Sequence, residues 1–116
     1  MEQTTGISIS ESSESFTVTG TGELDLKIAQ QFKDALERGT RSSSQLAVDF
    51  RKSYYIDTAI LQALVDTQRI LSKKNSRLRV VVLAGSHPDY VLKTVGFSEV
   101  MDIVVEDGPQ KTPGGG

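Results

Sequence analysis

Asp57 and Thr58 are the residues of this sequence whose types and spacing best suit a chemical role. They follow an apolar strand predicted at 46–50 and stand directly before an amphipathic helical stretch. Asp57 is therefore placed at the N-cap and Thr58 at the first position of the helix. Backbone N–H groups at a helix start lack partners and carry the positive end of the helix dipole, which favours a phosphate. Thr58 is a candidate phosphorylation site, and the alternative interpretation is an ordinary first-turn threonine.

Phosphorylation of Thr58 would add about −1.5 to −2 charges at the start of this helix. The helix dipole would favour that charge, whereas the neighbouring carboxylate of Asp57 would oppose it. We therefore expect the fold to persist while the local surface changes sharply. A partner that rests on this surface would lose its contact through repulsion and desolvation, so the site predicts a binding switch that needs no catalysis by the domain.

The segment from Gly20 to Asp25 begins like the glycine-rich fingerprint of dinucleotide-binding proteins. The third glycine of that fingerprint is missing, and the carboxylate of Asp25 in its place would repel a pyrophosphate. We interpret the segment as a turn followed by a helix N-cap.

His87 is the only histidine, and it precedes a proline and an aspartate. A metal site or a catalytic base would need further partners close in space, so we interpret His87 as a loop or helix-start residue. Ser86 and Asp89 have the spacing of a capping box. Asp49, Asp57 and Asp66 are scattered along the chain. We expect Asp49 near an edge or end of the sheet, Asp66 to be solvated, and no metal or cofactor.

The composition fits one globular domain in a chain of 116 residues, of which 37% are hydrophobic and 24% charged. The net charge of −2 gives no global attraction to nucleic acid or to an anionic membrane. There is no cysteine, which excludes disulfides and thiolate chemistry. No apolar run approaches the roughly 20 residues of a membrane helix, and Met1–Thr5 lacks the features of a secretory signal. We expect a cytoplasmic protein, either a monomer or a weak dimer.

Hydrophobic periodicity predicts strands and helices that alternate after an initial hairpin. Alternation predicts strands at 7–9, 16–20, 46–50, 78–83 and 102–105. Helical spacing predicts helices from Asp25 to a left-handed cap at Gly39, from Thr58 to Lys74, and from Pro88 to Gly96. A turn connects residue 50 to Asp57, and Asn75 stops the second helix.

The order of these elements predicts an α/β domain with a small mixed sheet. The first two strands form an antiparallel hairpin, and the later strands are parallel because helices connect them. The domain covers residues 7–105, and the flanking segments 1–6 and 106–116 are predicted to be disordered.

The residues 7–105 resemble the STAS domain family, named for sulfate transporters and anti-sigma factor antagonists. The resemblance lies in the order and spacing of four segments. These are Gly22-Glu23-Leu24-Asp25 with Ala29, the stretch from Val48-Asp49-Phe50 to Tyr55-Ile56-Asp57-Thr58, the strand Leu78-Arg79-Val80-Val81, and the helix from Val91 to Gly96-Phe97. The resemblance implies the STAS fold, in which helices pack against a small mixed sheet.

For a free-standing member, the resemblance implies a non-enzymatic anti-sigma factor antagonist. Such a protein binds an anti-sigma factor kinase and thereby releases a sigma factor. The kinase phosphorylates the residue after the aspartate, and a phosphatase restores binding. Carried over to this sequence, Thr58 is the phosphoacceptor, and Asp25, Asp57, Thr58 and Ala59 contact the partner.

The sequence departs from this pattern after Thr58, where Ala59 and Ile60 replace a second hydroxyl residue and a glycine. Asp-Thr-Ala is similar to the small STAS subunits of lipid-trafficking ABC transporters, which bind the ATPase subunit. The pattern of an aspartate and a hydroxyl residue with no following glycine also resembles the corresponding segment in the STAS domains of stressosomes. Both remain alternative functions.

Overall fold

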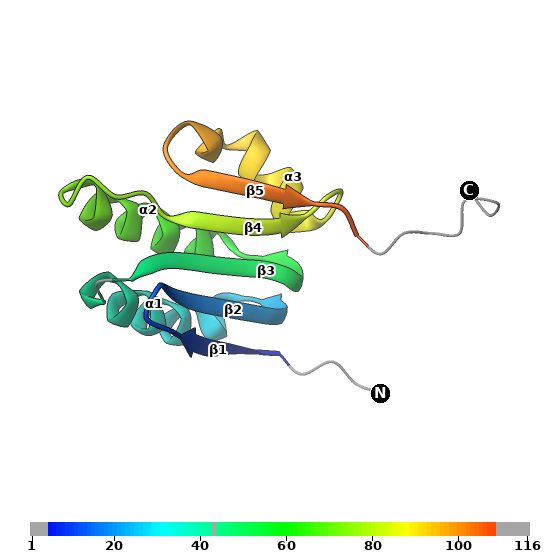
Figure 1. The fold of residues 1–116 in the computed structure, drawn as a ribbon. Coiled ribbons are helices and arrows are strands. Elements are labelled where there is room, and N and C mark those ends of the chain that lie inside the picture. Colours follow the sequence, from blue (N-terminus) through cyan, green and yellow to red (C-terminus); the bar gives the residue numbers. More distant parts are fainter. Residues whose placement is uncertain (1–4, 43, 109–116) are drawn as a thin grey trace.

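The computed structural model describes residues 5–42 and 44–108 (Figure 1). The elements in chain order are β1 (Gly6–Glu11), β2 (Ser15–Leu24), α1 (Leu26–Arg41), β3 (Gln45–Ile56), α2 (Thr58–Ser72), β4 (Arg79–Leu83), α3 (His87–Thr94), the short 3₁₀ helix η1 (Phe97–Glu99) and β5 (Asp102–Glu106). The segments predicted to be disordered lie mostly outside the described residues. At their inner ends, Gly6 begins β1 and Glu106 ends β5.

The five strands form one sheet in the order β1-β2-β3-β4-β5. The hairpin of β1 and β2 is antiparallel, whereas β2, β3, β4 and β5 run parallel. Helices connect the parallel strands because parallel neighbours need a crossover connection. The mixed sheet predicted from the sequence is confirmed.

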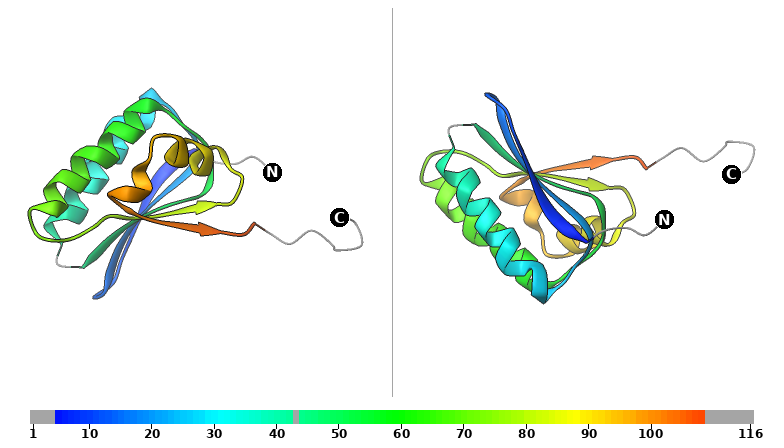
Figure 2. Two further views of the ribbon diagram at one scale, coloured as in Figure 1. Left: turned by 90° about the horizontal axis from the view of Figure 1, so that it is seen from above. Right: turned by 90° about the horizontal axis from the view of Figure 1, so that it is seen from below.

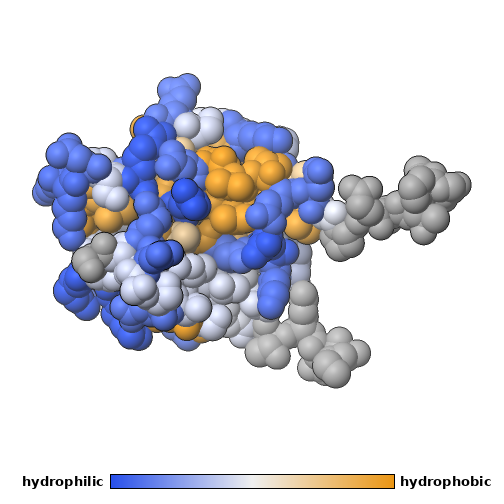
Figure 3. Space-filling view, in the orientation of Figure 1, coloured by the Kyte–Doolittle hydropathy of each residue, from blue (hydrophilic) through white to orange (hydrophobic). Residues whose placement is uncertain are grey.

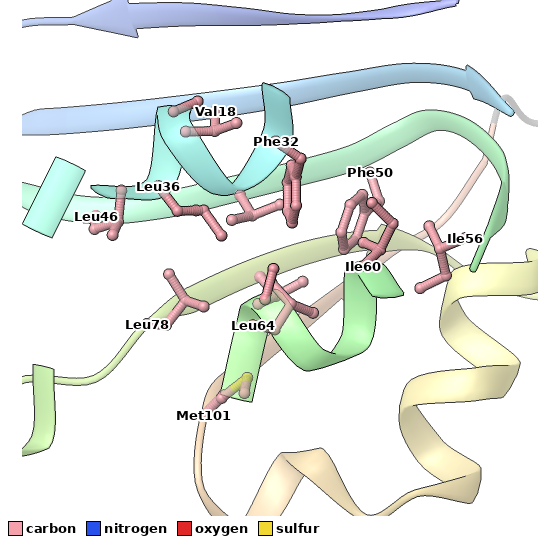
Figure 4. Close-up of a cluster of buried hydrophobic side chains, with 14 of the residues drawn as sticks. Val18, Phe32, Leu36, Leu46, Phe50, Ile56, Ile60, Leu64, Leu78 and Met101 are labelled. Atoms are coloured by element: carbon pink, nitrogen blue, oxygen red, sulfur yellow. The ribbon is translucent and has the colours of Figure 1, made fainter. Parts of the chain in front are cut away.

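All three α-helices lie on one face of the sheet, as the two views along its edge show (Figure 2). The core fills the space between this face and the helices, and its largest side chains include Phe32 from α1, Phe50 from β3 and Leu64 from α2 (Figure 4). The rings of Phe32 and Phe50 pack with their centroids 5.9 Å apart. These residues fall on the apolar faces that helical and strand periodicity predict.

The opposite face of the sheet is open, and apolar surface gathers on it over the middle and upper strands of the view (Figure 3). Asp49 lies on β3, the central strand, so its predicted place at a sheet edge or end is wrong. Arg51 lies two residues further on the same strand and binds both Asp49 and Glu106 at 2.8 Å. A carboxylate can therefore occupy the middle of an apolar strand, because Asp49 is only partly buried and its charge is paired with Arg51.

Burial alone would raise the pKa of Asp49, but hydrogen bonds from the side chain and the backbone N–H of Arg51 oppose this effect. The net result is that the pKa of Asp49 lies below its ordinary value. Asp49 therefore stays ionised as part of a structural ion pair.

Three of the boundaries that differ from the prediction have a clear structural cause. The predicted turn after residue 50 is strand, because β3 continues to Ile56 alongside the end of β2. The predicted turn at Gly20–Gly22 also lies in β2, where pairing with β3 shifts register and Gly22 has a φ of 83°. α1 continues past Gly39 to Arg41, and Gly39 does not have a positive φ. A Cβ at Gly39 would overlap Leu46, so this glycine allows close helix–sheet packing.

Candidate functional site

The candidate site lies where the parallel strands β2 and β3 end side by side. Leu24 and Ile56, the last residues of the two strands, are paired. The backbone N–H of Asp57 then donates to the carbonyl oxygen of Leu24 at 2.9 Å. Because each strand is followed at once by a helix, α1 and α2 begin next to each other at this end of the sheet.

Both helices begin with an aspartate whose side chain caps the first turn. Asp25 accepts a hydrogen bond from the backbone N–H of Lys27 at 3.0 Å, and Asp57 accepts one from that of Ala59 at 2.9 Å. These bonds satisfy N–H groups that have no partner within the helix. The two predicted N-caps are confirmed, and the fold brings them to the same end of the sheet.

Thr58 is the first residue of α2, and it is exposed. Its hydroxyl lies 3.5 Å from the carboxylate of Asp57, which is the outer limit of a hydrogen bond. The hydroxyl is therefore accessible from solvent and held only weakly. This position meets the steric requirement for modification, and the adjacent carboxylate is already engaged with Ala59.

Ala59 is half-buried and lines a groove between α1 and α2, which has a volume of about 220 Å³. Small residues from both helices form part of its wall, and polar side chains complete it. The lining residues are Ala29, Gln30 and Lys33 of α1, and Ala59, Gln62, Ala63 and Asp66 of α2. The groove runs from the site along the outer surface of the helix pair. Its signal in the sequence is the i, i+4 spacing of Ala59 and Ala63, which places both on one side of α2.

His87 is the first residue of α3. The sequence predicted either a loop or a helix start, and the helix start is confirmed. Its imidazole Nδ1 accepts a hydrogen bond from the backbone N–H of Ile56 at 3.1 Å. The ring also stacks on Tyr55, with centroids 4.8 Å apart. A third helix is thus attached to the chain directly before Asp57. Nothing in the local sequence predicts this contact, because the two residues are 31 positions apart.

The three scattered aspartates do not form a joint site. Asp49 lies on the open face of the sheet and Asp57 caps α2. Asp66 is partly exposed in α2, where it accepts a hydrogen bond from Gln62 and pairs with Arg69 at 3.7 Å. Within residues 5–42 and 44–108, no three His, Asp or Glu side chains are arranged to hold a metal ion. None of the helices in the described part of the chain is long and apolar enough to cross a membrane.

Several solved structures share this fold. An anti-sigma factor antagonist from Mycobacterium paratuberculosis superposes with a TM-score of 0.74 at 17% identity, covering 89% of this chain and 86% of the other. The anti-sigma factor antagonist SpoIIAA in its unphosphorylated form gives a TM-score of 0.64 at 15% identity and covers 90% of each chain. No curated protein matches this sequence significantly.

The sequence also matches one family model over nearly the whole described domain. The model is described as "Mlab, STAS domain", and the match covers residues 7–105. These are the limits within which the sequence itself resembles a STAS domain. The chain belongs to this family of STAS domains.

Proposed function

We propose that this protein is a non-enzymatic anti-sigma factor antagonist whose binding surface is switched by phosphorylation of Thr58. The observation that carries the proposal is the exposed hydroxyl of Thr58 at the start of α2, beside the N-cap Asp57. The solved antagonist structures with the same fold support the choice of partner class. The partners would be an anti-sigma factor kinase and a phosphatase, in the cytoplasm.

The proposed interface consists of the two helix starts and the groove that leads away from them. Asp25, Asp57, Thr58 and Ala59 would contact the anti-sigma factor. A phosphate on Thr58 would place negative charge beside Asp57 and at the mouth of the groove. The partner would then face an additional charge that has to be desolvated, so binding would be lost without any change of fold.

The test is affinity capture from native cell lysate, with mass spectrometry of the captured proteins and of Thr58. We expect wild type to capture a histidine-kinase-like anti-sigma factor and the unbound pool to carry phosphate on Thr58. Thr58→Ala and Thr58→Ser should retain the partner, whereas Thr58→Asp should lose it. Ser98→Asp is the matched control, because it adds the same charge at an exposed residue of η1. Equal capture by Thr58→Asp and Thr58→Ala would refute the switch.

A second function is favoured by the sequence Asp57-Thr58-Ala59, in which a half-buried alanine stands where a second hydroxyl residue is usual. We infer as the alternative a STAS subunit that binds the ATPase of a lipid-trafficking ABC transporter, without a phosphorylation cycle. The same capture experiment separates the two functions. An ABC-transporter ATPase with unmodified Thr58 would replace the antagonist proposal, and a large assembly of STAS proteins would indicate a stressosome scaffold.

A further inference from the structure

We propose that His87 is a positioning residue that holds the segment leading to Thr58 only while its imidazole is neutral. The evidence is the hydrogen bond from the backbone N–H of Ile56 to Nδ1 of His87, together with the stacking of the ring on Tyr55. An imidazole nitrogen that accepts a hydrogen bond carries no proton, so the remaining proton of the neutral ring is on Nε2.

The backbone of β3 requires this contact because its pairing with β4 is short. β3 pairs with β4 only at Ala47, Val48 and Asp49, although the strand continues to Ile56. Near its end, the N–H groups of successive residues point to opposite sides. Asp57 donates to Leu24 of β2, and Ile56 donates to His87 on the side where β4 is no longer paired. The imidazole thus provides the acceptor that a neighbouring strand would otherwise supply.

Protonation of Nδ1 would replace this acceptor with a donor that faces another donor. Ile56 is buried, with 3% of its surface exposed, so water has little access to compensate for the lost bond. The charged groups that line the same surface hollow as His87 are Lys52 and Arg51, and Arg51 is itself paired with the carboxylates of Asp49 and Glu106. The other titratable groups of β3 at this place are Tyr54, which lines the hollow, and Tyr55, which stacks on the ring. β4 contributes only Leu83 to the hollow.

The consequence reaches the candidate site because Ile56 immediately precedes the N-cap Asp57. Histidine is the side chain that changes charge between about pH 5 and pH 8. Protonation of the His87 ring would release the end of β3 from α3 and loosen the segment Ile56–Thr58. The inference concerns the protein alone and does not depend on the partner proposed above.

The test is amide hydrogen exchange of the full chain at pH 8 and pH 5.5, corrected for the intrinsic pH dependence of exchange. In wild type, we expect the protection of the Ile56 amide to fall about tenfold at pH 5.5, as for loss of one hydrogen bond. The amide of Val48, on the same strand and far from His87, should keep its protection. Nitrogen chemical shifts at pH 8 should show the proton on Nε2 of His87.

Two variants separate the hydrogen bond from the bulk of the ring. His87→Asn offers an oxygen near the position of Nδ1 and does not titrate, so Ile56 should remain protected at both pH values. His87→Phe keeps a ring that stacks on Tyr55 but has no acceptor, so Ile56 should be unprotected at both. The proposal is overturned if His87→Phe protects Ile56 as wild type does, if Val48 loses protection in parallel, or if wild type shows no pH dependence.

Discussion

Asp57 donates its backbone N–H to the carbonyl oxygen of Leu24 at 2.9 Å, and this bond joins the starts of two helices. Leu24 is directly followed by the N-cap Asp25, and Asp57 is itself the N-cap of α2. Two helix dipoles therefore present their positive ends at one place, and each is capped by a carboxylate. A phosphate on Thr58 would add negative charge to a surface that already contains two helix N-termini and two capping carboxylates.

The first prediction concerns the cap of α2. Asp57→Ala removes the acceptor for the N–H of Ala59 and should lower the free energy of unfolding by about 1 kcal/mol. Asp57→Asn retains an acceptor and should stay close to wild type, as measured by urea denaturation. If Asp57→Asn nevertheless lost the captured partner, the charge of Asp57 would be needed for binding. A fully stable Asp57→Ala would contradict the capping role.

The groove between α1 and α2 gives the second prediction. Ala59→Arg would fill the groove near Thr58, and affinity for the captured partner should fall by at least about tenfold. Gln31→Arg is the control, because Gln31 lies on the other side of α1 and lines a hollow with Ile7 and Ile9. Titration calorimetry with both variants decides the matter. Equal affinities would show that the partner does not use the groove.

The third prediction concerns the ion pair on the open face. The folded-state pKa of Asp49 lies below the ordinary value of 3.8. Its contribution to stability is therefore fully present above that value and is lost as the pH falls through the lowered pKa. Asp49→Asn should cost about 1 kcal/mol at pH 7, because Arg51 is partly exposed and the pair is screened.

Denaturation curves at several pH values test this prediction. The difference between Asp49→Asn and wild type should shrink as the pH falls below 3.8 and through the lowered pKa of Asp49, and it should disappear once the carboxyl group is protonated in both states. Asp34→Asn, at an exposed position on α1, should change stability little at any pH. A constant difference down to the lowest pH would assign the effect to packing rather than to charge.

The fourth prediction concerns Gly39. Alanine is normally favoured over glycine within a helix by about 1 kcal/mol. Here the added Cβ would overlap Leu46 and approach Phe16 to 3.0 Å, so Gly39→Ala should instead destabilise the protein by about 1 kcal/mol. Lys33→Ala, at an exposed site of α1, should remain within about 0.5 kcal/mol of wild type in the same urea experiment. A more stable Gly39→Ala would show that the core has room at this point.

Features that depend on a few consecutive residues could be read from the sequence. The N-caps Asp25, Asp57 and Ser86 were predicted correctly, because capping is decided by the side chain and the next two or three N–H groups. Asn75 and Gly96 were also predicted as helix stops, because asparagine and glycine tolerate the left-handed backbone that these two residues adopt. Helical spacing predicted the three helices, and the alternation of strands and helices predicted the mixed sheet.

Features that depend on contacts between distant residues could not be read in this way. Local chemistry suggested a C-cap at Gly39, but the approach of α1 to Leu46 decides its role. Asp49 can lie on the central strand because Arg51, which also pairs with the distant Glu106, balances its charge on the open face. The length of β3 follows from its pairing with β2, and the bond between Ile56 and His87 follows from where α3 begins. Such pairings depend on how the folded chain brings separate segments together, and the residues next to each partner in the sequence do not indicate that arrangement.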